Sequence, residues 1–133
     1  GVKIGIGAKD EKDLSDPKIN LSDKFHAGVE PFEADILFSD GDEFTVGDIP
    51  FKVILTPGHT VGEVCYLSGN SLFSGDTLFK GSVGRTDFPG GDTRILLRSV
   101  KKLVALPGGT EVYPGHGDFT TIAEEKNNNM FAW

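Results

Sequence analysis

Three short stretches of the sequence place a metal-binding side chain directly after a glycine that ends an apolar run. They are Thr56-Pro57-Gly58-His59-Thr60, Phe73-Ser74-Gly75-Asp76-Thr77 and Tyr113-Pro114-Gly115-His116-Gly117. Each apolar run predicts a strand, and each Pro/Gly break predicts the point at which that strand stops. Imidazole nitrogen and carboxylate oxygen are good ligands for zinc or iron. We therefore predict a metal site at the end of a sheet, formed by His59, Asp76 and His116.

The chemistry of these three side chains suits a pair of cations. The two oxygens of Asp76 can contact one cation each, while neutral His59 and His116 offer a nitrogen on either side. Thr60 and Thr77 follow two of the ligands, and their hydroxyls either orient the ligands or make ordinary strand-end hydrogen bonds. A chance origin would require the same arrangement of strand, glycine and ligand to arise three times in one short chain.

The glycine-rich loop at residues 80–91 lacks the Gly-Lys-Ser/Thr ending and the regular spacing of nucleotide-binding loops. We therefore exclude a nucleotide site there. Arg85 either pairs with Asp87 and holds the shape of the loop, or lines the mouth of a substrate site beside the metal. We favour the structural role, because arginine often braces loops.

Two further reactive residues are expected to have no catalytic role. Cys65 lies in the middle of an apolar strand, which favours packing over nucleophilic chemistry. His26 lies in connective sequence with no other ligand nearby, and we expect a loop histidine.

The expected elements place the ligands together. Strands are predicted at residues 2–6, 36–38, 43–46, 49–55, 63–67 and 71–74. The dipeptides Asp40-Gly41, Gly47-Asp48 and Gly69-Asn70 are typical of hairpin turns, and the last of them brings the His59 and Asp76 strands into one neighbourhood. Helices are predicted at residues 10–14, 22–25 and 93–106, capped by Asp10, by Ser22 or Asp23, and by Asp92, and a final helix starts with the Thr121 to Glu124 capping box.

Composition limits the classes of partner. The chain has 133 residues, 38% of them hydrophobic, which suffices for one core and one domain at most. Its net charge of -7 disfavours nucleic acid and anionic membrane surfaces as partners. A single cysteine, the lack of a signal-peptide pattern and the lack of an apolar run of about 20 residues favour a reducing cytoplasm.

The three motifs, together with the loop from Gly84-Arg85-Thr86-Asp87 to Gly91-Asp92, occur in an order that resembles metallo-β-lactamase-fold hydrolases of the glyoxalase II-like (hydroxyacylglutathione hydrolase-like) group. The likeness runs from about Val2 to Phe131. It implies an α+β fold, namely the C-terminal portion of a four-layer αββα sandwich with mostly antiparallel strands, and residues 1–133 would form one partial domain. The family's His-x-His-x-Asp-His motif is not in this sequence, and we expect it to precede Val2.

The resemblance implies a metal-dependent hydrolase that cleaves a thioester or related acyl bond through a metal-bound hydroxide. It implies two zinc ions per complete site, with iron or manganese as alternatives. His59 would bind one ion, His116 the other, and Asp76 both, so that Asp76 would also be catalytic. Because three ligands are then shared by two ions, we expect this chain alone to bind metal weakly or not at all and to be inactive.

Two alternatives stay open at this point. The chain could be a non-catalytic fragment or a degenerate association module, or it could belong to an iron-dependent persulfide dioxygenase, a group of the same fold that shares the Gly-Arg-Thr-Asp loop. The expected partners are a small thioester or acyl substrate and, because part of a sandwich leaves an apolar face uncovered, a second copy or a missing N-terminal segment.

Overall fold

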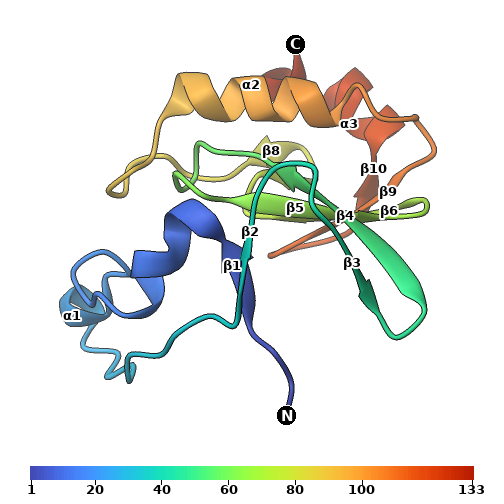
Figure 1. Cartoon of the computed structure of the whole chain (residues 1–133). Coiled ribbons are helices and arrows are strands. Elements are labelled where there is room, and N and C mark those ends of the chain that lie inside the picture. Colours follow the sequence, from blue (N-terminus) through green and yellow to red (C-terminus); the bar gives the residue numbers. More distant parts are fainter.

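The computed structural model describes all residues, 1–133, and is built around a six-stranded sheet, with the helices Thr93–Leu103 and Ile122–Asn128 on one face and the N-terminal segment on the other side (Figure 1). The strands are β1 (Gly5–Gly7), β2 (Ile36–Phe38), β3 (Glu43–Val46), β4 (Ile49–Leu55), β5 (Val64–Ser68), β6 (Ser71–Gly75), β7 (Leu78–Phe79), β8 (Ser82–Val83), β9 (Glu111–Pro114) and β10 (Thr120–Thr121). The helices are α1 (Ser22–Phe25), α2 (Thr93–Leu103) and α3 (Ile122–Asn128), with 3-10 helices η1 (Ala8–Leu14) and η2 (Met130–Ala132).

The order of strands in the main sheet is β10-β9-β6-β5-β4-β3. All neighbours are antiparallel except β6 and β9, which pair in parallel with Leu72 opposite Val112. The hairpins predicted at Gly47-Asp48 and Gly69-Asn70 are therefore confirmed. Two antiparallel steps take the chain from β4 through β5 to β6, so β4, β6 and β9 all run in the same direction and end at the same edge of the sheet.

The core lies between this sheet and α2. One face of α2 is apolar because Leu96, Val100 and Leu103 recur at helical spacing, and all three are buried. Asp92 caps the helix, its Oδ1 accepting the Ile95 N–H at 2.9 Å. The helix ends at Leu103, earlier than predicted, since the following residues form a turn before Pro107. The core cluster comprises Ile54, Cys65, Leu72, Leu78, Leu96, Val100, Leu103, Val104, Val112 and Ile122.

The prediction of a hairpin at Asp40-Gly41 is wrong. The strand before it, β2, pairs in parallel with β1, with Gly5 opposite Ile36. The Asp40 carboxylate instead accepts the Leu55 N–H at 2.7 Å and a hydrogen bond from Lys102 Nζ at 3.1 Å. These two contacts, the backbone one first, lower the pKa of Asp40. The turn is thus held by a strand and a helix distant in sequence, and it carries the chain from β2 to the main sheet.

Two predictions at the N-terminal end also need correction. The first strand covers Gly5–Gly7 instead of residues 2–6, because its register follows β2. Asp10 does not cap a helix. It lies inside η1, where its buried carboxylate accepts the Gly62 N–H at 2.6 Å. The short helix predicted near Ser22 is confirmed as α1.

The face of the sheet opposite α2 carries a row of aromatic rings. The β1 and β2 pair lies on this side of the sheet (Figure 1), where the ring centroid of Phe38 lies 4.8 Å from that of Phe44. Farther along, Phe73 stacks on Tyr113 at 5.6 Å and Tyr113 on Phe119 at 6.2 Å, yet Phe119 is 63% exposed. The aromatic row therefore continues beyond the part of the face that β2 covers.

This exposed aromatic row leads us to expect self-association of the 133-residue chain, since contiguous apolar patches of several hundred Å² are uncommon on monomers. For the chain on its own, a second copy of the chain is the partner that could cover this aromatic row. Native mass spectrometry and light scattering should give a mass above 14.3 kDa, and Phe73→Ser combined with Phe119→Ser should lower it. A monodisperse wild-type monomer would contradict the expectation.

Candidate metal centre

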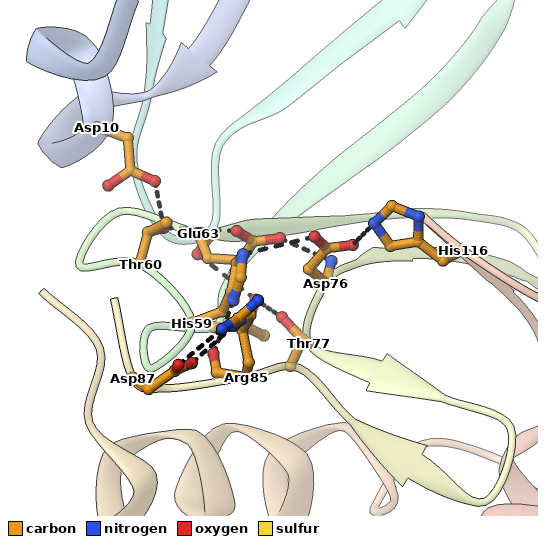
Figure 2. Close-up of polar contacts among 10 residues, drawn as sticks. Asp10, His59, Thr60, Glu63, Asp76, Thr77, Arg85, Asp87 and His116 are labelled. Atoms are coloured by element: carbon orange, nitrogen blue, oxygen red, sulfur yellow. Dashed lines mark hydrogen bonds and ion pairs between the residues drawn. The ribbon is translucent and has the colours of Figure 1, made fainter. Parts of the chain in front are cut away.

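His59, Asp76 and His116 follow the ends of β4, β6 and β9, the three strands that run in the same direction. Their side chains consequently meet at one edge of the sheet, as Figure 2 shows for the imidazole of His116 and the carboxylate of Asp76. The sequence-based grouping of these residues agrees with this placement. Their role as ligands stays a prediction.

The Asp76 carboxylate lies between the two imidazoles. Its Oδ2 is 3.4 Å from His59 Nε2, and its Oδ1 is 3.3 Å from His116 Nε2. The His59 side chain is 18% exposed and that of His116 75% exposed, so the site is enclosed at His59 and open to solvent at His116. Because each imidazole contacts a different oxygen, Asp76 is the residue shared by both.

The orientation of His59 is fixed by a hydrogen bond from its Nδ1 to the backbone carbonyl of Arg85, at 2.8 Å. A carbonyl only accepts hydrogen bonds, so Nδ1 carries a hydrogen, and in the neutral ring Nε2 turns its lone pair toward Asp76. Two acceptors that face each other repel unless a proton or a metal cation lies between them. A metal cation fits this requirement, and metal-binding histidines commonly donate their other N–H to a carbonyl or carboxylate.

Two glycines make room for the Asp76 turn. A Cβ on Gly115 would lie 2.5 Å from Asp76 Oδ1, and a Cβ on Gly84 would lie 1.7 Å from the Asp76 carbonyl oxygen. Both separations are far below van der Waals contact. Only glycine at these positions lets the backbone just after β9 and that of the loop at residue 84 pass beside Asp76.

A second carboxylate, Glu63, lies beside the site and was not predicted from the sequence. Its Oε1 accepts the backbone N–H of Asp76 at 3.0 Å, and its Oε2 lies 3.4 Å from Thr60 Oγ1. The Thr60 hydroxyl also contacts Asp10 Oδ2 (Figure 2). Burial raises the pKa of Glu63. No spacing rule links Asp10, Thr60 and Glu63 to Asp76, because the contacts depend on how distant segments pack.

Thr77 follows Asp76 at the end of β6, and its side chain is buried. Its hydroxyl donates to Thr56 Oγ1 at 3.0 Å, and Thr56 Oγ1 lies 3.2 Å from Cys65 Sγ. Burial raises the pKa of the Cys65 thiol to about 12, so the thiol stays protonated at neutral pH. Thr77 and Cys65 thus belong to a small polar cluster within the core.

Arg85 and Asp87 form the ion pair expected from the structural reading. Arg85 Nε and Nη2 each donate to an Asp87 oxygen at 2.7 Å, and the guanidinium lies 3.8 Å from the centroid of the Phe88 ring. These hydrogen bonds lower the pKa of Asp87 to about 2. The pair holds the loop whose Arg85 carbonyl orients His59. His26 is exposed at the end of α1, where its φ is 50°.

No group of three or more His, Cys, Asp or Glu side chains is arranged to hold one metal ion by itself. The residues at this edge provide one imidazole on each side of a shared carboxylate, an arrangement that suits part of a larger ligand set. None of the helices combines the length and the apolar character needed to cross a bilayer.

Comparison with known proteins gives this site its context. A family model described as the metallo-beta-lactamase superfamily matches residues 1–116. Glyoxylase B2 of Dictyostelium discoideum is 39% identical over 138 residues, which cover 95% of this chain and 47% of that protein. The chain spans about half the length of the curated relatives it matches.

Solved structures agree with the family match. BLEG-1 B3 metallo-beta-lactamase is 38% identical with a TM-score of 0.91, over 98% of this chain and 65% of that one. ETHE1 from Myxococcus xanthus is 43% identical with a TM-score of 0.72, over 74% and 47%. TTHA1623, solved in a di-iron-bound form, is 32% identical with a TM-score of 0.81, over 98% and 65%.

The fold class is thereby confirmed, since mainly antiparallel strands with flanking helices superpose on metallo-β-lactamase folds. Proteins of this fold usually bind metal ions, as the di-iron form of TTHA1623 illustrates. By its family match, its relatives and its structure, the chain belongs to the metallo-beta-lactamase superfamily.

Proposed function

We propose that the natural full-length protein is a metal-dependent hydrolase of thioesters or related acyl bonds, similar to glyoxalase II. The observation that carries the proposal is the placement of two imidazoles on opposite oxygens of Asp76. The likeness to glyoxylase B2 supports it. Residues outside this chain would supply the remaining ligands.

In this proposal His59, Asp76 and His116 hold the metal ions, with zinc as the preferred metal. A cation held there would supply Lewis acidity, which would polarise the acyl carbonyl and make a water molecule more acidic. Water then adds across the acyl–sulfur bond, which yields a carboxylic acid and a free thiol. The Arg85 carbonyl keeps His59 turned toward Asp76, and the exposed side at His116 gives the substrate access.

A second candidate is an iron-dependent persulfide dioxygenase. It is favoured by the Gly84-Arg85-Thr86-Asp87 loop and by the likeness to ETHE1 from Myxococcus xanthus. The Pro89-Gly90-Gly91-Asp92 sequence that follows looks more like that of the hydrolases, so we place the dioxygenase second.

The two candidates differ in products and in metal. The natural full-length protein, purified with its native metal, should release thiol from a hydroxyacyl thioester of glutathione, contain zinc, and lose activity when a chelator removes the metal. Oxygen uptake with glutathione persulfide together with iron would favour the dioxygenase. Neither activity in the metal-loaded protein would contradict the proposed function and favour a non-catalytic association module.

A further inference from the structure

Glu63 connects two turns that carry proposed metal ligands. It immediately precedes β5 and is partly buried. One of its carboxylate oxygens accepts the backbone N–H of Asp76 at 3.0 Å, and the other lies 3.4 Å from the hydroxyl oxygen of Thr60, the neighbour of His59. The Glu63 side chain thus contacts both Thr60, next to His59, and the backbone of Asp76.

The backbone around Glu63 is shaped for this contact. Gly75 has a φ of 51°, a conformation that favours glycine, and a Cβ there would lie 2.4 Å from Glu63 Oε1. The absence of a side chain at Gly75 is what lets the carboxylate reach the next residue, Asp76. A carboxylate that only interacted with solvent would not need to lie so close to the backbone of Gly75.

The Thr60 side of the connection is held by Asp10. The buried carboxylate of Asp10 accepts the Gly62 N–H at 2.6 Å and the hydroxyl of Thr60. A Cβ on Gly62 would lie 2.5 Å from the Asp10 backbone nitrogen, so η1 packs closely against the His59 turn. Asp10 therefore fixes Thr60, Thr60 contacts Glu63, and Glu63 holds Asp76.

We propose that Glu63 is a positioning residue of the metal centre, which sets the separation of His59 Nε2 from the Asp76 carboxylate through the hydrogen bond that it accepts from the Asp76 amide and through its contact with the Thr60 hydroxyl. This inference rests on the proposed metal ligands but not on the proposed substrate. Glu63 acts mainly through the hydrogen bond that its Oε1 accepts from the Asp76 N–H, so the property required at this position is a correctly placed acceptor.

The requirement for an acceptor gives a direct test with two variants. Glu63→Gln keeps an amide oxygen that can accept the Asp76 N–H, whereas Glu63→Ala removes both acceptors. Glu43→Ala, at an exposed carboxylate on β3, is the matched control. Affinity for Zn²⁺ is measured on the natural full-length protein, stripped of metal, by competition with a chromophoric chelator. Hydrogen exchange of the Asp76 amide and thermal unfolding are measured on the same metal-free samples.

Glu63→Ala should weaken Zn²⁺ binding by about 10- to 100-fold, as is typical when the partner of a metal ligand is lost, and should speed exchange of the Asp76 amide. Glu63→Gln and Glu43→Ala should stay near wild type in both measurements. An unchanged affinity in Glu63→Ala would overturn the proposal. So would an equal loss in Glu63→Gln, which would make Glu63 a ligand, or a loss of affinity with no change in Asp76 exchange.

These readouts separate the inference from the proposed function. If the protein hydrolyses no thioester but Glu63→Ala alone loses Zn²⁺ affinity, the positioning role stands and the hydrolase proposal fails. If thioester turnover is found and Zn²⁺ affinity is the same in every variant, the hydrolase proposal stands and the positioning role fails.

Discussion

Replacing Asp76 by alanine in the natural full-length protein is expected to abolish thioester turnover and to remove metal from both positions of the site. The carboxylate lies 3.3–3.4 Å from both imidazoles, so its loss takes a ligand from each side at once. Metal content measured by mass spectrometry of the purified protein, together with thiol release, tests the prediction.

The two histidines give the matched comparison for Asp76. His59→Ala and His116→Ala should each deplete mainly one metal position, because each imidazole contacts only one carboxylate oxygen. His26→Ala, in the exposed turn after α1, should change neither metal content nor turnover. Full metal content and full activity in all three site variants would show that the assigned residues are not the ligands.

Gly84→Ala is expected to have the second large effect, on folding and on the site together. The new Cβ would lie 1.7 Å from the backbone oxygen of Asp76 and 3.4 Å from the Cβ of His59. A backbone oxygen cannot rotate away as a flexible side chain can, so the main chain must move. Overpacking of this kind typically costs about 1–3 kcal/mol, and the shift should also lower Zn²⁺ affinity.

Chemical denaturation of the metal-free protein and a Zn²⁺ titration measure the two effects of Gly84→Ala separately. Gly109→Ala is the control, since a Cβ at Gly109 meets no atom within 4 Å and its φ is not in the left-handed region. An unfolding free energy and a Zn²⁺ affinity equal to those of the control would mean that the loop has more freedom than the structure indicates.

Most of the fold could be predicted where the signal is local. The hairpin between β5 and β6 follows from Gly69-Asn70, and α2 follows from its Asp92 cap and its apolar spacing. The placement of His59, Asp76 and His116 at one edge of the sheet could also be predicted, because the glycine before each of them marks the end of a strand. Their role as ligands stays a prediction.

Features set by distant contacts could not be predicted in the same way. Asp40-Gly41 has the composition of a hairpin turn, but hydrogen bonds from Leu55 and Lys102 decide what the turn connects. Asp10 resembles a helix cap, yet it binds a turn 50 residues later in the sequence. Glu63 appears as an ordinary residue at the start of a strand, and only the close packing against Gly75 shows what it contacts.

The parallel pairing of β6 with β9 has a consequence for the order of events during folding. The strands β4 and β5 are joined by residues 56–63, and β5 and β6 by the turn Gly69-Asn70. Local loops and hairpins of this size close within microseconds. In contrast, Ser71 lies opposite Glu111, 40 residues later in the chain, and closing so long a loop costs entropy before any contact compensates for it. His59 and Asp76 can therefore approach each other early, while His116 arrives only when β9 docks. A cation that needs both imidazoles would therefore bind only at the end of folding. The nearly folded structure, and not the unfolded chain, would then determine which metal is bound.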